Sequence, residues 1–190
     1  MAENRDDLDL INSFKNGEET AFEGLVFKYQ DRIYNLCRHM LGEPHDADDA
    51  AQETFIKAYK NLKAFRPEAS VYTWLYRIAV NTCIDHKRRP FFESLFKRSS
   101  EGEDFVLERP SDSPSPERLY ESKQTGVAIQ LALKKLSDKL RTVIVLKEIG
   151  GLSYEEISDV LDVSIGTVKS RISRAREELK GLLKEFMEQK

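Results

Sequence analysis

The sequence predicts an all-α protein made of two small helical domains joined by a flexible linker. Apolar residues recur at steps of three and four, and no segment shows the alternation of a half-buried strand. A stretch rich in serine, proline and acid also divides the chain. With 190 residues, 40% of them hydrophobic and 33% charged, the chain is expected to bury two small cores rather than one large one.

The first predicted helix spans residues 20–41. Its apolar side chains, from Phe22 to Met40, lie at steps of three and four. Thr20 and Glu23 have the spacing of a capping box, and a glycine and a proline follow the last turn. The pattern therefore predicts a helix with one buried face.

Two more helices are predicted before the linker, over 46–62 and from Ser70 to about Pro90, with a loop at 65–69. The later helix is expected to stop near Pro90, because proline disfavours helical geometry in the residue before it.

The predicted linker covers 97–119 and separates a first domain, 1–96, from a second, 120–190. Five serines and six acids fall within 99–117, and four of the six prolines fall within 90–116. Such a composition cannot offset the entropy lost on ordering, so a flexible tether is expected.

Four helices are predicted after the linker. The first spans 118–136, and the second begins at Ser137 and ends at a pair of glycines. Val143–Val145 has the composition of a buried strand, but its polar flanks and the lack of a partner strand favour helix. A capping box from Ser153 to Glu156 opens a short third helix, and a three-residue turn leads into the last one.

The last two helices and their turn have the spacing of a helix-turn-helix. Residues 169–176 carry four bases and no acid. Side chains at the start of a recognition helix reach base edges in the major groove, where arginine bonds guanine and hydroxyls bond bases. The alternative is an antiparallel helix pair with a solvated basic face. The candidate DNA-contacting residues are Thr167, Lys169, Ser170, Arg171, Ser173, Arg174 and Arg176.

Aromatic residues gather in the segment 55–76, which holds six of them, and basic residues follow at Arg77 and Lys87–Arg89. Aromatic side chains beside Lys and Arg residues suit single-stranded nucleic acid, because its unpaired nucleobases stack on the aromatic rings. Thr73 and Asn81 are able to read base edges. The alternative is that the aromatics at helical spacing belong to the core; these are Phe55, Tyr59 and Trp74.

Acidic and amide side chains crowd the start of the helix predicted over 46–62. The helix macrodipole accounts for two of them, and the surplus is expected to face a basic partner protein. Metal binding by the carboxylates is a further option, but no histidine or second cluster is spaced to complete a site. The residues are Asp46, Asp48, Asp49, Gln52 and Glu53.

No metal, cofactor or catalytic activity is predicted. Cys37 with His39 and Cys83 with His86 lack the fixed spacing of zinc modules, and both cysteines fall near apolar helix faces. Nucleophile-elbow, P-loop and dinucleotide-binding glycine motifs are absent from the sequence.

The charge balance excludes a protein that coats nucleic acid with a uniformly basic surface, because 33 acidic residues outnumber 30 basic ones. Acidic and basic blocks instead alternate along the chain, which is typical of distinct surfaces for distinct partners. Two cysteines indicate a reducing compartment. Without a signal core or an apolar run of about 18 residues, we expect a cytoplasmic protein with no membrane insertion.

Several stretches together resemble one family. They are Asp46–Tyr59, Phe65-Arg66, Tyr72–Thr82, Leu152–Ile157 and Gly166–Glu178. In this order and spacing, from about residue 8 to 186, the chain resembles bacterial extracytoplasmic-function (ECF) sigma factors of the sigma-70 superfamily, and most of all the sigma-E-like group.

The resemblance implies a subunit that directs RNA polymerase to promoters, with region 2 in the first domain and region 4 in the second. By position, Asp49, Gln52 and Glu53 match the contact with the polymerase β′ clamp. The residues that match the face reading the −35 element are Thr167, Lys169, Ser170, Ser173 and Arg174, and we place Arg171 in the same site. The residues that match the −10-binding and melting surface are Phe65, Arg66, Tyr72, Thr73, Trp74, Arg77, Asn81, Lys87 and Arg88.

The implied partners are the polymerase core (β and β′ subunits), double- and single-stranded promoter DNA, and an anti-sigma factor. The acidic linker is implied to thread toward the basic active-site cleft and RNA exit channel. A conventional helix-turn-helix regulator that binds duplex DNA without polymerase is the alternative.

Overall fold

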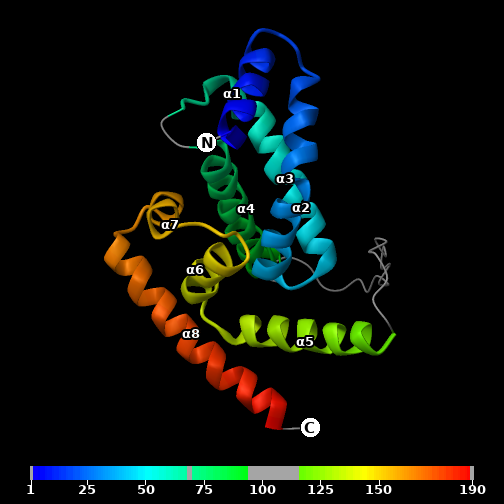
Figure 1. The fold of residues 1–190 in the computed structure, drawn as a ribbon, viewed down its shortest axis with the longest axis vertical. Coiled ribbons are helices and arrows are strands. Elements are labelled where there is room, and N and C mark those ends of the chain that lie inside the picture. Colours follow the sequence, from blue (N-terminus) through cyan, green and yellow to red (C-terminus); the bar gives the residue numbers. More distant parts are fainter. Residues whose placement is uncertain (1, 68–69, 94–115, 189–190) are drawn as a thin grey trace.

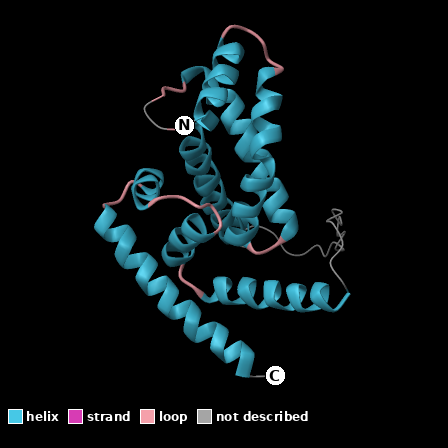
Figure 2. Ribbon diagram, viewed as in Figure 1, coloured by secondary structure: helices cyan, strands magenta, loops and turns pink. Residues whose placement is uncertain are grey.

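The computed structural model describes residues 2–67, 70–93 and 116–188, and these are almost entirely helical (Figure 1, Figure 2). No strand occurs in these three ranges, and the all-α prediction is confirmed. The helices are α1 (Ala2–Lys15), α2 (Ala21–Leu41), α3 (Pro44–Asn61), α4 (Val71–Glu93), α5 (Pro116–Lys135), α6 (Asp138–Glu148), α7 (Tyr154–Leu161) and α8 (Ile165–Glu188), with a 3-10 turn η1 (Leu62–Ala64) after α3.

The predicted capping box at Thr20 is wrong. The Thr20 backbone is helical, with φ −62° and ψ −22°, and its side chain makes no capping hydrogen bond. The backbone N–H groups of Ala21, Phe22 and Glu23 already donate to carbonyls of the preceding turn. The donors that a capping side chain would satisfy are therefore occupied.

Two other features differ from expectation. α4 continues to Glu93, three residues past Pro90. A proline near the end of a helix forfeits one backbone hydrogen bond there, so the helix is not forced to stop. α1 was not predicted, although Ile11 and Phe14 on its inner face are buried.

α1 to α4 form a bundle around one core (Figure 1). Five residues of the apolar α2 pattern are buried: Leu25, Tyr29, Ile33, Leu36 and Met40. Phe22, the first residue of that pattern, is half-buried and packs against this core. Asp7 of α1 is 2% exposed, and its carboxylate accepts hydrogen bonds from Lys28 Nζ at 2.6 Å and Tyr29 Oη at 2.5 Å. The periodic face thus forms the predicted core, and a buried carboxylate fixes α1 to it.

α5 to α8 form the C-terminal part, in which α8 packs on α5, α6 and α7. Val143–Val145 are buried within a helix, as favoured by their flanks. Leu146, Leu152 and Ile157 are buried and belong to the same apolar cluster as Val168, Ile172 and Ala175 of α8. α5 begins at Pro116, inside the predicted linker 97–119, and the rest of that linker up to 115 lies outside the described residues.

The two parts pack against each other, α2 on α6 and α4 on α7, and their buried apolar residues form one continuous cluster (Figure 1). Arg141 of α6 lies at this junction and is 8% exposed. Its guanidinium donates to the carbonyls that end α5, Leu133, Lys134 and Leu136, at 2.7–3.0 Å, and to Met40 of α2 at 3.3 Å. One arginine therefore satisfies the end of α5 and links it to the N-terminal bundle.

Candidate nucleic-acid interface

The helix-turn-helix is built by α7, a three-residue turn and α8, as the spacing predicts. Ser153 and Glu156 form the predicted capping box, because each side chain accepts from the other's backbone N–H, at 3.1 and 2.7 Å. Asp162 then turns the chain with φ +51°, and Ser158 Oγ donates to Val163 O at 2.5 Å. The turn is thus held by its own side chains, which fixes where α8 begins.

The start of α8 is capped by Ser164, whose Oγ accepts from Thr167 N at 3.1 Å and lies 2.9 Å from Thr167 Oγ1. Val168, Ile172 and Ala175 are buried against the domain core. Because these three residues define the inward face of α8, the helical repeat determines which residues lie on its outward face. The exposed candidates on it are Lys169, Ser170, Ser173 and Arg174, while Thr167 and Arg171 are half-buried.

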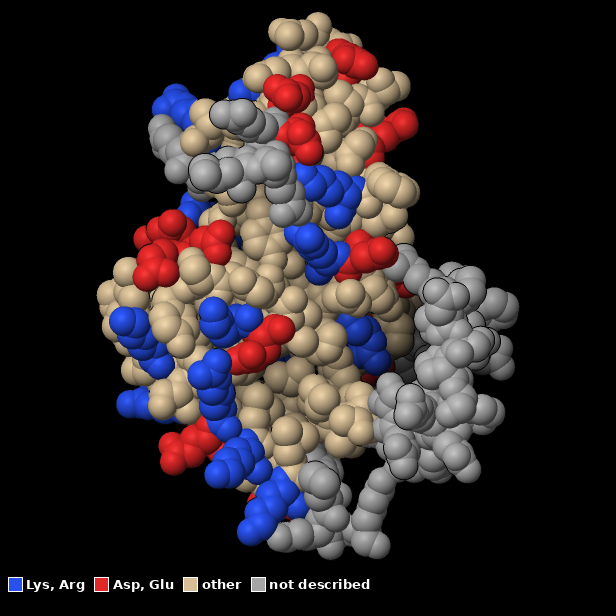
Figure 3. All heavy atoms as spheres, in the orientation of Figure 1, with Lys and Arg blue, Asp and Glu red and all other residues tan. Residues whose placement is uncertain are grey.

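Lys and Arg side chains gather along α8 on the face shown in Figure 3. Not every base of the segment is available for DNA. Arg176 donates through Nε and Nη2 to Glu148 Oε1 of α6, at 3.1 and 2.7 Å. The pair ties α8 to α6, so the Arg176 side chain is engaged within the domain.

The −10 candidates divide into buried and exposed groups. Phe65 is 5% exposed and packs edge-on against Trp74, with ring centroids 5.1 Å apart. Thr73 is buried, and its backbone N–H donates to Ser70 Oγ at 3.0 Å. These side chains shape the loop and the start of α4 from inside. The candidates exposed to solvent are Arg66, Arg77, Asn81 and Arg88, and those half-buried are Tyr72, Trp74 and Lys87.

Three candidates on α4 touch the C-terminal part. The Tyr72 hydroxyl donates to the Gly150 carbonyl, and the Arg77 guanidinium donates to the Asp159 carbonyl. Lys87 Nζ lies 2.6 Å from Asp138 Oδ1. The sequence contained no signal for these contacts, because each joins residues at least 51 positions apart.

The acidic face of α3 is only partly open. Asp49 and Gln52 are exposed, and Asp49 pairs with His45 at 3.2 Å. Glu53 is half-buried between α3 and α4, with His86 Nε2 at 2.8 Å and Lys57 Nζ at 3.0 Å. Glu53 is therefore held between α3 and α4, whereas the side chains of Asp49 and Gln52 are exposed on the surface of α3.

Cys37 and Cys83 are both buried, on α2 and α4. A hydrogen bond with Cys83, together with burial, raises the pKa of the Cys37 thiol. His39 Nδ1 instead contacts Asn35 O at 2.7 Å, and His86 contacts Glu53. The four side chains do not converge, and within the described ranges no three His, Cys, Asp or Glu side chains group as metal ligands.

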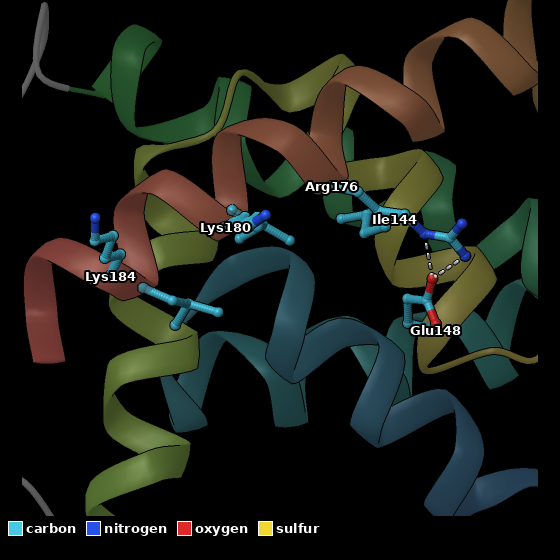
Figure 4. Close-up of a pocket in the computed structure, with 7 residues that line it drawn as sticks. Ile144, Glu148, Arg176, Lys180 and Lys184 are labelled. Atoms are coloured by element: carbon cyan, nitrogen blue, oxygen red, sulfur yellow. Dashed lines mark hydrogen bonds and ion pairs between the residues drawn. The ribbon is translucent and has the colours of Figure 1, made fainter.

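An open groove of about 690 Å³ between α6 and α8 was not anticipated from sequence (Figure 4). Its base is apolar, formed by Ile144, Leu179 and Leu183, while Lys180 and Lys184 lie along α8 beside it. The four-residue step from Leu179 to Leu183 was the available signal. The mixture of apolar base and basic edge suits an amphipathic segment with acidic flanks.

None of the helices in the described ranges is both long and apolar enough to cross a membrane.

Comparison with known proteins identifies both parts. The family Sigma-70 region 2 matches residues 25–90, and Sigma-70, region 4 matches residues 126–179. The ECF RNA polymerase sigma factor SigW of Bacillus subtilis is 42% identical, over 93% of this chain and 96% of SigW. The ECF RNA polymerase sigma-E factor of Haemophilus influenzae is 38% identical, over 98% of this chain and all of that protein.

A solved structure agrees with these matches. CnrH in complex with the cytosolic domain of CnrY superposes with a TM-score of 0.69 at 29% identity, over 95% of this chain and 98% of CnrH. The RpoE–NepR complex of Bartonella quintana shares the fold, with a TM-score of 0.67 at 24% identity and 87% of this chain covered. With both regions matched in order and full-length relatives above 30% identity, this chain belongs to the family of ECF RNA polymerase sigma factors.

Proposed function

We propose that this chain is a dissociable sigma subunit that brings bacterial RNA polymerase to promoters in the cytoplasm. It reads the −35 element as duplex through α8 and opens the −10 element through α4 and the loop before it. The observation that carries this proposal is the exposed polar and basic face of α8, on the second helix of a helix-turn-helix, in a chain that carries both sigma regions. The protein contributes binding energy and itself makes or breaks no covalent bond.

The −35 contact follows from the outward face of α8. The major groove admits a helix, and side chains in its first turns reach base edges. Arg174 carries the planar donor pair that bonds guanine, while Ser170, Ser173 and Lys169 are placed for bases or phosphates. With so few uncommitted bases, this contact is expected to be modest by itself.

The −10 contact uses the exposed candidates on α4 and its preceding loop. Arg66, Asn81 and Arg88 offer donors to a displaced strand, and the buried pair of Phe65 and Trp74 supports the loop. Extruding a base costs a few kcal/mol, which pocket contacts and stacking offset.

Two weak contacts on one chain reinforce each other. Once the −35 contact forms, the −10 surface is held at a high effective concentration that the tether sets. We propose a region 2 domain over 1–96, a tether over 97–119 and a region 4 domain over 120–190. The acidic residues of the tether suit the basic RNA exit channel of the polymerase, which otherwise holds RNA phosphates.

The polymerase contact is proposed at α3. Asp49 and Gln52 are exposed and suited to a basic surface of the β′ subunit, with β as a second site of attachment. Glu53, held by His86 and Lys57, positions the α3–α4 pair beneath them. Control by an anti-sigma factor is also proposed, because the sigma factor RpoE of Bartonella quintana, which shares this fold, was solved in complex with the anti-sigma factor NepR.

Transcription in vitro tests the proposal. The chain is added to purified bacterial core polymerase and a genomic promoter library, and the transcripts are sequenced. Specific initiation that depends on the chain is expected, and the transcripts reveal both promoter elements. No initiation, with sequence-specific duplex binding by the chain alone, would instead identify a conventional helix-turn-helix regulator.

A further inference from the structure

The groove between α6 and α8 has an apolar floor that is open on one side (Figure 4). Ile144 is buried at its base, whereas Leu179 and Leu183 of α8 are only half-buried. These two leucines lie one turn apart and leave apolar surface in water. Because the removal of such surface from water is favourable, the floor of the groove gains from being covered.

The rim of the groove is positively charged. Lys180 and Lys184 line it, one turn apart on α8, and both side chains are exposed. Glu148 also lines the groove, but Arg176 pairs with it at 2.7 Å, so these two charges offset each other. The lysines therefore set the sign of the rim, and an occupant is expected to carry acidic side chains beside its apolar ones.

The chain itself contains such a segment among residues 94–115, which lie outside the described ranges. From Glu101 to Glu108 the sequence reads EGEDFVLE, with three consecutive apolar residues, four acids and no base. The other apolar pair in this part of the sequence, at 95–96, is followed directly by two bases, which the lysines of the groove would repel. Charge therefore selects Phe105–Leu107 as the apolar residues that suit the groove.

The connection to α5 is long enough to bring this segment to the groove. Glu108 precedes Pro116, the first residue of α5, by eight positions, which span up to about 27 Å when extended. α5 has 20 residues, which makes it about 30 Å long, and it packs on α8. On the other side, eleven positions separate Glu93 of α4 from Asp104, so up to about 37 Å is available there. A segment that runs back along α5 covers most of the length of that helix and so reaches α8.

We propose that the segment 101–108 docks in the α6–α8 groove of its own chain. Phe105 and Leu107 cover the apolar floor, and the acids on either side of them lie beside Lys180 and Lys184. The same residues cannot fill this groove and thread into the polymerase at the same time. Docking therefore belongs to the free chain, where it also keeps an amphipathic helix of another protein out of the groove.

Carbodiimide cross-linking of the free chain tests the docking. The reagent joins carboxylates to amines that are already in contact, so the wild-type chain should yield peptides that link the segment 101–108 to Lys180 or Lys184. Phe105→Ser with Leu107→Ser should abolish these links, although it leaves every acid and lysine in place. Leu95→Ser with Phe96→Ser is the matched control, because it removes the same two kinds of side chain nearby, and it should keep the links.

Isotope mixing identifies which chain supplies the segment. Unlabelled and 15N-labelled chains are mixed before the carbodiimide is added, and the linked peptides are analysed by mass spectrometry. Links within one isotopic form only are expected. Links that join the two forms would show that a second copy fills the groove, and they would overturn docking within one chain.

A peptide probe measures how strongly the segment competes for the groove. The probe is a fluorescein-labelled peptide of residues 99–112, and its binding to the full chain is followed by anisotropy. A tethered segment has an effective concentration of order 1 mM, so with a dissociation constant of about 0.1 mM it would fill about nine grooves in ten. The probe should therefore bind the Phe105→Ser, Leu107→Ser variant about tenfold more tightly than the wild type or the control variant. Equal affinity for all three chains, or no binding to any of them, would overturn the docking.

Cross-linking in the holoenzyme separates this inference from the proposed function. The links to Lys180 and Lys184 should disappear when core polymerase binds, because the tether then enters the polymerase. Absence of the links already in the free chain would overturn the docking. Links that form in the free chain and persist fully in the holoenzyme would support the docking and contradict the threading of the tether.

Discussion

Arg141 offers the sharpest test of how the C-terminal part is held together. Its guanidinium is buried, and it donates to four backbone carbonyls, three at the end of α5 and one on α2. Burial lowers the pKa of this arginine, while Asp138 opposes that shift. The hydrogen bonds from this side chain to the four carbonyls therefore have to offset the cost of desolvating its charge.

The expected cost of Arg141→Ala follows from that inventory. Hydrogen bonds to a charged donor contribute about 1.5–3 kcal/mol each, but the burial of the guanidinium offsets much of their sum. Truncation leaves carbonyls of Leu133, Lys134 and Leu136 without this donor in a place that water reaches poorly. Each buried carbonyl that loses its donor costs about 1–3 kcal/mol, so we expect a total loss of about 3–5 kcal/mol, which is a large share of the stability of a small domain.

Urea unfolding followed by circular dichroism at 222 nm measures this loss. Lys139→Ala is the control, because Lys139 is exposed on the same helix, and it should change stability by less than about 0.5 kcal/mol. Arg141→Lys keeps the charge without the planar fork and should recover only part of the loss. A loss below about 1 kcal/mol for Arg141→Ala would refute the idea that this arginine secures α5.

Other predictions concern binding, pH and reactivity. Arg174→Ala should cost about 1–3 kcal/mol of discrimination at one −35 position in competition binding; equal weakening on every duplex would show a phosphate contact only. Gln52→Ala should weaken core polymerase binding at unchanged thermal stability, whereas Glu53→Ala should also lower the melting temperature, because it removes the partner of His86; holoenzyme affinity unchanged in both would place the interface elsewhere. The hydrogen bond from Lys87 lowers the pKa of Asp138 in the folded chain. This bond therefore stabilises the folded chain at pH values above the unfolded pKa of Asp138, near 3.9, and the stabilisation is lost as pH falls through the lower, folded pKa. Solution scattering should show the chain expanding in acid and keeping its size between pH 5 and 8. Iodoacetamide should modify Cys37 slowly in the native chain and rapidly in denaturant, because the hydrogen bond with Cys83 and burial raise its pKa; rapid native labelling would disprove this burial.

Local sequence patterns predicted the structure correctly only where the neighbouring backbone had not already bonded the groups that the pattern would bond. Ser153 and Glu156 form a capping box, whereas Thr20 and Glu23, with the same spacing, do not. The difference lies in the turn before α2, whose carbonyls already accept the first N–H groups of the helix. A four-residue motif carries no information about that turn.

Periodicity predicted burial for strong patterns and failed for sparse ones. The face of α2 and the inner stripe of α8 were evident because apolar residues recur over several turns. α1 was missed since its large apolar residues all lie in its second half, from Leu8 to Phe14, and span fewer than two turns. Its attachment through Asp7, a buried carboxylate bonded to Lys28 and Tyr29, runs against the usual preference of acids for the surface.

The sequence alone determined the helical class, the helix-turn-helix and the resemblance to the sigma family. These depend on spacing along single helices, which the 3.6-residue repeat makes readable. Only the tertiary structure decided which candidates are free: Phe65 and Thr73 are buried, and Glu53 and Arg176 have partners on neighbouring helices. It also showed that Tyr72, Arg77 and Lys87 bond the other half of the chain. Such contacts join residues far apart in sequence, and they depend on how whole helices pack rather than on any local pattern.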